Sequence, residues 1–428
     1  GPYTIAAGDT LNLAASVVGT PVSYAWNINN SGFLPTTTQS TESFTWAQLE
    51  ALPNHPVQDA GTYSVQLRVT YASGLGVTSA TTNLVVTDVA PTATLTNSGP
   101  VNEGSTATVT FANPTDVSQG EVNAGFTYSY DFNNDGKIDF VTTTAVATVP
   151  VQYLSLPGTD TVRGIITDQN GSSTTLFTTI TVNEVPPTLV VTGASNVKEG
   201  QPYQLGLSAT DPGAETIQTW VVDWNGDGSD VQTVNGATQS LTHVYGDDVA
   251  HTIGITAYDP YGTFTASKAV TVTNATPQIQ SLATTPTTEG SLTDLTGVIV
   301  DPSTTDTYVL SVAWGDGSNS SYNLTANGKA FDFTHLYGES PASGTYAVTA
   351  TVTDDEGANS SATTNAAVAD VPPAITSFVS SVPTTAEGGT ISVTGAFTDP
   401  GALDTQSAMI SWGDGTKSAA TVDETTHL

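Results

Sequence analysis

A short stretch returns four times along the chain, and this recurrence constrains the fold more than any other feature. Its fullest copy spans residues 131–140, with shorter copies at 223–228, 314–317 and 412–415. In each copy an aromatic residue leads from a strand-like segment into an Asp-Gly turn, whose glycine tolerates the positive φ angle of a tight hairpin. A stretch repeated at this spacing predicts a tandem array of small, similar domains.

Other turn signals recur in the same register. Glu-Gly pairs begin at Glu103, Glu199, Glu289 and Glu387, in steps of 96, 90 and 98 residues. Each pair is followed by Asp-Pro or Asn-Pro and then by the aromatic hairpin, and the full copies end in an Asp-x-x-Gly turn and a proline-bearing linker. We therefore predict a divergent first repeat, three full repeats and an incomplete fifth that lacks its last two strands, at residues 1–88, 89–183, 184–274, 275–370 and 371–428.

Between the turns the dominant pattern is alternation of apolar side chains with Thr or Ser, as in residues 63–69 and 346–352. This period of two is typical of half-buried strands. About seven short strands in each repeat of ~95 residues predict an all-β chain, a tandem array of immunoglobulin-like β-sandwiches. Residues 44–52 are the single helix candidate.

The charge of the chain excludes several classes of partner. Seven Lys and Arg residues stand against 40 Asp and Glu, a formal net charge of −33. A surface this negative repels nucleic acid and anionic lipid and attracts cations. No apolar run reaches the ~18 residues of a membrane span, and there is no cysteine. Because the chain opens Gly-Pro-Tyr without a methionine, we expect it to be a piece of a longer protein.

The fullest copy of the hairpin has the spacing of a calcium loop. Oxygen ligands at positions 1, 3 and 5, a glycine at 6, a backbone carbonyl at 7 and a carboxylate at 9 match such a loop, although position 12 is Thr142 and not Glu. The alternative is an Asp-rich turn that binds nothing. The candidate ligands are Asp131, Asn133, Asp135, Lys137 through its carbonyl, and Asp139.

The later copies of the hairpin fit the calcium loop less well. The second keeps Asp223, Asn225 and Asp227 but has Val231 at position 9. In the last two copies Ala313 and Ser411 replace the first Asp, so we predict turns only.

A second group of candidate metal ligands comes from the expected chain trace. In an immunoglobulin-like sandwich the Asp-Pro and late Asp turns lie at one end, and the Glu-Gly turn and the hairpin lie at the other. Carboxylates of adjacent repeats would converge at each joint, where their mutual repulsion favours a bound cation. The alternative is that these residues only begin or cap turns. The candidates are Asp211, Glu215 and Asp259 with Glu184; Asp301, Asp306 and Asp354; and Asp399 and Asp404 with Asp370.

Nothing in the sequence indicates catalysis. The chain has no Gly-x-Ser-x-Gly elbow, His-Glu-x-x-His motif or phosphate loop, and its carboxylate pairs recur in every repeat, which an active site has no reason to do. We expect His243 and His335 to pair with the backbone of the fold. The tryptophans at equivalent strand positions, Trp224, Trp314 and Trp412, are predicted to be core residues.

Taken in order, Glu-Gly, Asp-Pro-Gly, Trp-Gly-Asp-Gly, His-x-Tyr, Gly-Thr-Tyr and Thr-Asp-Asp-x-Gly form a series that resembles the polycystic-kidney-disease (PKD) repeat, which occurs in arrays on large bacterial surface and secreted proteins. The resemblance covers repeats two to five well and repeat one loosely. It implies a β-sandwich that serves as a spacer, a ligand-presenting module or an adhesive module, without catalysis.

These observations predict a non-enzymatic structural or adhesive segment of a larger bacterial surface protein or fibre, located outside the cell and stiffened by Ca²⁺. Its partners would be neighbouring repeats or copies of the same protein, including strand completion of the last repeat, and cell-surface or matrix polysaccharide. Two alternatives stay open. The repeats could be glycan-binding accessory modules of a secreted hydrolase, or the chain could be a surface-layer subunit.

Overall fold

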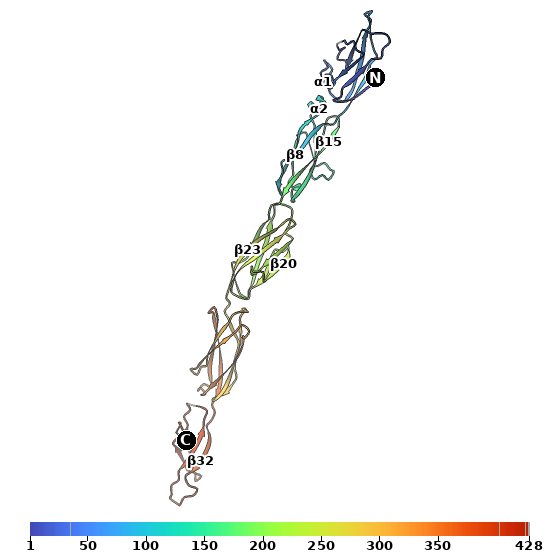
Figure 1. Cartoon of the computed structure of the whole chain (residues 1–428). Coiled ribbons are helices and arrows are strands. Elements are labelled where there is room, and N and C mark those ends of the chain that lie inside the picture. The colour runs from blue at the N-terminus through green and yellow to red at the C-terminus, as the bar shows by residue number, and fades with distance from the viewer. Residues whose placement is uncertain (35, 402, 424, 427–428) are drawn as a thin grey trace. The chain divides into compact units, whose positions relative to one another are not determined.

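The computed structural model describes residues 1–34, 36–401, 403–423 and 425–426. Strands dominate, and the few helices are short (Figure 1). The chain divides into two compact units, each treated by itself below. Unit 1 comprises Gly1–Leu189, Ala209–Thr219 and Ala257–Phe264, and unit 2 comprises Val190–Ser208, Trp220–Thr256 and Thr265–Leu428.

The strands form successive pairs of sheets, which confirms the predicted all-β, immunoglobulin-like array. In the first sheet pair, one sheet has the order β1-β7-β5-β3 with β6 beside β5, and the other is β2-β4. The strands are β1 (Tyr3–Ala6), β2 (Leu11–Ala14), β3 (Ser23–Ile28), β4 (Thr41–Phe44), β5 (Gly61–Thr70), β6 (Gly76–Thr78) and β7 (Thr82–Thr87).

Helix α1 (Trp46–Glu50) lies between β4 and β5 and is shorter than the predicted helix at 44–52. Phe44 belongs to strand β4, and Thr45 caps the helix by accepting a hydrogen bond from the Gln48 amide. A second helix, α2 (Gln119–Ala124), was not predicted.

The second sheet pair places the order β13-β10-β8 against β12-β11-β14-β15-β9. Its core includes Phe111, Tyr130 and Phe132, the last from the hairpin that follows β11. The elements are β8 (Thr92–Asn97), β9 (Val101–Asn102), β10 (Ala107–Thr115), β11 (Thr127–Asp131), β12 (Phe140–Thr142), β13 (Val146–Val149), the 3-10 turn η1 (Val151–Tyr153), β14 (Gly158–Thr167) and β15 (Ser173–Asn183).

The third sheet pair repeats this arrangement, with the orders β16-β18-β21 and β17-β23-β22-β19-β20. Its strands are β16 (Thr188–Thr192), β17 (Asn196–Lys198), β18 (Pro202–Thr210), β19 (Thr219–Asp223), β20 (Val231–Asn235), β21 (Ser240–Val244), β22 (Ala250–Tyr258) and β23 (Thr263–Thr273).

The fourth sheet pair again has a three-stranded and a five-stranded sheet, in the orders β24-β26-β29 and β25-β31-β30-β27-β28. Alternate residues of β27 are buried, as a period of two requires. The strands are β24 (Gln278–Thr284), β25 (Thr287–Thr288), β26 (Ser291–Val300), β27 (Tyr308–Ala313), β28 (Asn319–Leu324), β29 (Ala330–Tyr337), β30 (Thr345–Asp354) and β31 (Asn359–Ala369).

The fifth sheet pair, as far as the structure describes it, has two sheets of two strands each. Apolar side chains such as Ile375, Phe378 and Met409 are exposed there. The repeat boundaries given above remain predictions. The strands are β32 (Ala374–Ser380), β33 (Val393–Thr398), β34 (Ala408–Ser411) and β35 (Lys417–Ala420).

Candidate metal centres

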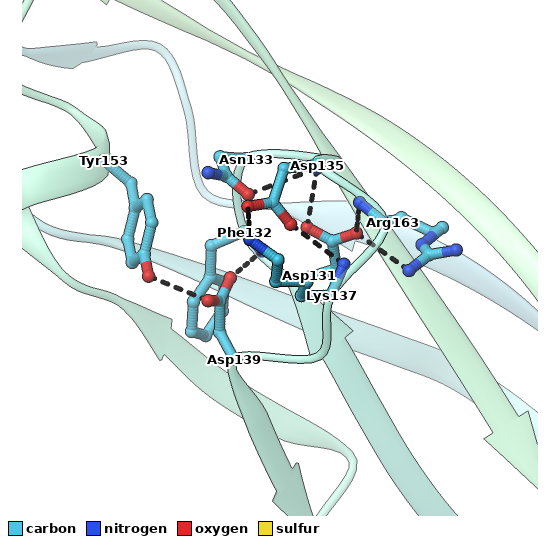
Figure 2. A network of polar contacts seen from close by, with 9 residues as sticks. Asp131, Phe132, Asn133, Asp135, Lys137, Asp139, Tyr153 and Arg163 are labelled. Carbon is cyan, nitrogen blue, oxygen red and sulfur yellow. Dashed lines mark hydrogen bonds and ion pairs between the residues drawn. The ribbon is translucent and has the colours of Figure 1, made fainter.

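The hairpin after β11 folds around the carboxylate of Asp131, which is fully buried (Figure 2). Asp131 Oδ1 accepts a hydrogen bond from the Asp135 amide at 3.1 Å, and Oδ2 accepts one from the Gly136 amide at 3.0 Å. Arg163 Nη2 lies 2.9 Å from the same Oδ2. The antiparallel register of β11 and β14 sets Asp131 opposite Arg163, so the first predicted calcium ligand already has a cationic partner.

The other predicted ligands of this hairpin also accept hydrogen bonds within it (Figure 2). Asn133 Oδ1 accepts from the Asp135 amide at 3.2 Å, and Asp135 Oδ1 accepts from the Lys137 amide at 2.9 Å. Asp139 accepts from the Phe132 amide at 2.8 Å and from the Tyr153 hydroxyl at 2.9 Å. The structure brings these side chains together, while calcium binding by the loop remains a prediction.

The second copy of the hairpin has the same backbone-directed geometry. Asp223 accepts hydrogen bonds from the Gly226 amide at 2.9 Å and the Gly228 amide at 2.8 Å. Asn225 Nδ2 donates to Ser229 Oγ at 3.0 Å, and Asp227 accepts from the Ser229 amide at 2.9 Å. Hydrogen bonds from Ser229 lower the pKa of Asp227. These contacts shape a turn, and calcium binding here likewise remains a prediction.

The expectation that His243 and His335 pair with the backbone is wrong. Their rings stack on Trp224 and Trp314, with centroid separations of 4.6 and 4.4 Å. The Nε2 of His335 lies 2.8 Å from Oδ2 of Asp316, which belongs to the hairpin. The histidine thus covers one face of a core tryptophan and holds the hairpin through a carboxylate.

The prediction of core tryptophans is confirmed for Trp224 and Trp314, which are 1% and 0% exposed. It is wrong for Trp412, which is 37% exposed. Trp412 follows β34 in the fifth sheet pair, where the described strands form only two-stranded sheets. These strands do not bury the Trp412 ring as the larger sheets bury Trp224 and Trp314.

The Glu-Gly turns at Gly104, Gly200 and Gly290 pack against the Asp-Pro turn of the following sheet pair. A Cβ atom added at Gly104 would lie 2.4 Å from the Pro212 carbonyl oxygen, and one at Gly200 would lie 2.4 Å from Pro302 Cβ. Both glycines have positive φ angles, 68° and 72°. The glycine therefore permits the Glu-Gly turn to approach the Asp-Pro turn closely, and this approach places the preceding glutamate at the joint.

The acidic residues of unit 1 converge at what we call joint 2–3, defined by Glu103, Glu184, Asp211, Glu215 and Asp259. One carboxylate oxygen from each of the first four lies within 4.8 Å of the others. The other oxygen of Glu103 accepts a hydrogen bond from the Val185 amide, and the other oxygen of Asp211 accepts one from the Gly213 amide, both at 2.7 Å. The buried oxygens without a hydrogen-bond partner are Glu103 Oε2, both Oε atoms of Glu184 and Glu215, Asp211 Oδ2 and Asp259 Oδ2.

The sequence predicted four of these five residues and missed Glu103. Its Glu-Gly turn is predicted to face the next repeat, yet Glu103 is not among the predicted ligands. The recurrence of glutamate at this position in repeats two to five was the available signal, because a turn alone needs only the glycine.

Crowding of carboxylates perturbs their protonation at joint 2–3. Burial, with neighbouring Glu215 and Glu184, raises the pKa of Glu103 to about 7. Burial, followed by the charges of Asp259 and Glu215, raises the pKa of Glu184 to about 7. The cation-free joint therefore favours protons on groups that are ordinarily ionised, and a bound cation would relieve the same repulsion.

A pH prediction follows for the cation-free protein. The folded pKa values of Glu103 and Glu184 exceed the ordinary 4.5, so the folded state holds more protons between about pH 4.5 and 7, and stability falls as the pH rises through 7. In chelator we expect the melting temperature to be roughly 5–10 °C higher at pH 5 than at pH 8. Scanning calorimetry across this range measures it, and a higher melting temperature at pH 8 would contradict it.

Joint 3–4, in unit 2, is defined by Glu199, Asp247, Asp301, Asp306 and Asp354. Its carboxylates form two groups whose oxygens lie within 4.8 Å of one another, Asp301 with Asp306 and Asp354, and Glu199 with Asp247 and Asp306. Burial raises the pKa of Asp301, Asp306 and Glu199. The structure thus brings together the three predicted residues and adds Glu199 and Asp247, which the sequence interpretation missed.

Joint 4–5, also in unit 2, brings Glu289 to the predicted Asp399 and Asp404. The amides of Val371 and Ser340 donate to Glu289 at 2.8 and 3.0 Å. Burial and the nearby charges of Glu339 and Asp370 raise the pKa of Asp404, which places the predicted linker residue Asp370 close to the group.

A further group in unit 1, joint 1–2, was not predicted and consists of Asp88, Glu121 and Asp168. Burial, together with Asp116, raises the pKa of Glu121 to about 9. Asn170 Nδ2 donates to Glu121 Oε1 at 2.6 Å. The signal was hidden because Asn-Pro replaces Asp-Pro in this repeat and because Glu121 comes from the unpredicted helix α2. Asp168 matched the late turns of the other repeats and could have indicated it.

Two models of the PKD domain match residues 2–86 and 274–369. No curated protein matches the chain at a significant level. Within the described part of the chain, no helix is both long and apolar enough to cross a membrane.

Solved structures that resemble the chain are themselves tandem arrays. The tetra-tandem repeat in the extending region of a large adhesion protein is 19% identical, with 85% of this chain and 96% of that chain covered and a TM-score of 0.43. A Ca²⁺-stabilised adhesin with which an Antarctic bacterium binds ice is 16% identical, with 85% and 95% covered and a TM-score of 0.25. Immunoglobulin domains 1–5 of Sidekick-1 are 12% identical, with 93% and 83% covered and a TM-score of 0.24.

Proposed function

Because this chain is a tandem array of immunoglobulin-like domains that contains PKD domains, we propose that calcium ions bound at its joints fix consecutive sandwiches to one another. The array would then act as a non-enzymatic structural or adhesive segment of a larger protein at the cell surface or outside the cell. PKD and immunoglobulin-like domains are typically non-catalytic.

One observation carries this proposal, namely the seven buried carboxylate oxygens of joint 2–3 that have no hydrogen-bond partner. A buried, unpaired carboxylate is costly unless it is protonated or coordinates a metal. Calcium takes six to eight oxygen ligands in flexible geometry, whereas magnesium requires near-ideal octahedral geometry and zinc favours nitrogen and sulfur. An irregular, all-oxygen set of carboxylates therefore fits calcium best.

The origin of the ligands explains how an ion would stiffen the joint. Glu103 follows β9 of the second sheet pair, Glu184 lies in the linker, and Asp211 follows β18 of the third pair. One ion bound to all three would tie two sandwiches and their connection together. The linker continues with Pro186 and Pro187, which restrict the backbone further. Calcium sites of extracellular modules are filled at 10⁻⁴–10⁻³ M, so such a joint would be loaded outside the cell.

The glycan-binding alternative has less support. Sugar-binding platforms need exposed aromatic rings, and Trp224 and Trp314 are buried beneath histidine rings. A surface-layer subunit would differ by forming lattices when calcium is added.

Melting of the full chain in about 10 mM calcium and in chelator tests the proposal. An ion that binds only the folded state at 100 times its Kd contributes about 2.7 kcal/mol, so we expect the melting temperature to rise by roughly 10 °C in calcium. Glu103→Gln should shrink this rise. Glu387→Gln, at the equivalent but exposed Glu-Gly turn of the fifth repeat, is the matched control and should leave it unchanged. Identical melting in calcium and in chelator would refute the proposal.

A further inference from the structure

We propose that joint 3–4 holds two calcium ions bridged by the carboxylate of Asp306. This inference rests on the proposed calcium function and adds to it the number and arrangement of the ions. It starts from the fact that Asp306 belongs to two groups of carboxylates at once, one with Asp301 and Asp354 and the other with Glu199 and Asp247.

Each group contains a buried carboxylate oxygen that no donor satisfies. In the first group these are Asp301 Oδ2 and Asp306 Oδ2, and in the second it is Glu199 Oε2. The side chains of Asp301, Asp306 and Glu199 are all more than nine-tenths buried. Their other oxygens are held by the protein, since Asp301 accepts from the Ser303 amide at 2.8 Å and Glu199 from the Ala275 amide at 2.7 Å. Each carboxylate is thus oriented by one oxygen and offers the other to the group.

The charge of the joint favours two ions over one. The five carboxylates of joint 3–4 have further acidic neighbours in Asp248, Asp355 and Glu356. Two cations oppose them, Lys198 near Asp301 and Lys329, whose ammonium donates to the backbone carbonyls of Asp301 and Ser303 at 2.8 and 2.7 Å. One divalent ion would leave an excess of buried negative charge, which is unfavourable in a poorly solvated site. Two ions offset twice as much of this negative charge as one ion does. A carboxylate shared between two ions is the simplest way to hold them in one compact site.

A neutral ligand is also available. Asn274 Nδ2 donates to Asp354 Oδ2 at 2.9 Å, which leaves the buried Asn274 Oδ1 without a partner. Amide oxygens are ordinary calcium ligands. The joint can therefore supply oxygen ligands beyond its five carboxylates.

Joint 2–3 lacks the counterpart of Asp247. The Gly104 amide donates to the Leu154 carbonyl, and the equivalent Gly200 amide donates to the Tyr245 carbonyl. Two residues further on, unit 1 has Leu156 where unit 2 has Asp247. At joint 4–5 the Gly290 amide donates to the Tyr337 carbonyl, and the residue two positions further on is Glu339. An acidic side chain at this position is therefore shared by joints 3–4 and 4–5 and is missing from joint 2–3.

Counting the bound calcium of the full chain tests the bridge. Equilibrium dialysis with metal analysis gives the number of ions bound by wild type, Asp306→Asn, Asp247→Asn and Asp354→Asn. We expect Asp247→Asn and Asp354→Asn each to lose one ion, their double variant to lose two, and Asp306→Asn alone to lose two. Melting in chelator provides the folding control, where loss of a repelling charge at Asp306 should leave the melting temperature unchanged or higher.

Other outcomes would overturn the inference in recognisable ways. If joint 3–4 holds a single ion, Asp306→Asn loses one and the double variant loses no more than Asp354→Asn. If Asp247→Asn binds as many ions as wild type, the second group does not take calcium. If wild type binds no calcium at all, the proposed function itself fails, and the two failures are thereby distinguished.

Discussion

Replacing Trp314 by alanine is expected to destabilise the fourth sheet pair by about 4 kcal/mol, within the range for deletion of a buried aromatic side chain. Trp314 is fully buried and packs in the core with Leu310 and Tyr337. Its ring is stacked on His335, and its Nε1 donates to Ser320 Oγ at 2.9 Å. Alanine would leave a large cavity that the surrounding strands cannot fill.

Hydrogen exchange measured by mass spectrometry reads this effect locally, because peptides from β27 and β30 report the opening of the fourth pair within the intact chain. The chain contains its own matched control. Trp412 occupies the equivalent hairpin position but is 37% exposed, so Trp412→Ala should cost less than about 1 kcal/mol. Similar losses at the two sites would mean that burial at this position does not determine its contribution.

Replacing Asp131 by alanine is expected to destabilise the second sheet pair by about 3 kcal/mol, since removing one partner of a buried ion pair leaves the other charge unpaired. The side chain of Asp131 is fully buried, and that of its partner Arg163 is mostly so. The substitution also leaves the amides of Asp135 and Gly136 without their acceptor. The free energy of unfolding in chelator, from exchange in β11 and β14, measures the effect.

Asp135→Ala in the same hairpin is the control. Asp135 faces Lys137 at 3.8 Å, and their side chains are 41% and 85% exposed, so their pairing should contribute no more than about 0.5 kcal/mol. Repeating both measurements in calcium also tests the predicted calcium loop. If the loop binds calcium, Asp135→Ala becomes clearly destabilising only when the ion is present. If calcium leaves both differences unchanged, the hairpin is a turn closed by Arg163 and binds no ion.

The resemblance to the PKD repeat, drawn from the turn series alone, is borne out by family models that match residues 2–86 and 274–369. Its functional implication is less specific. The presence of such domains supports a structural or adhesive repeat, whereas the proposed calcium stiffening would depend on the joints, whose carboxylate sets differ from one another.

What the sequence determined by itself is the local structure. The strand predicted at 346–352 lies within β30, and the strand at 63–69 lies within β5. The Asp-Gly turns have the expected positive φ angles, for example 93° at Gly136 and 95° at Gly317. These features depend on the alternation of side chains and on glycine at a turn, which are properties of a few neighbouring residues.

Only the tertiary structure decided which distant side chains meet. Arg163, one of two arginines in the chain, reaches Asp131 through the register of β14 on β11. Glu103 reaches Asp211 because Gly104 lets its turn pack against Pro212. Asp247 joins Asp306 from a turn that carried no recognised motif. Such contacts depend on strand pairing and on how one sandwich follows another, and no local pattern in a single repeat encodes these long-range relations.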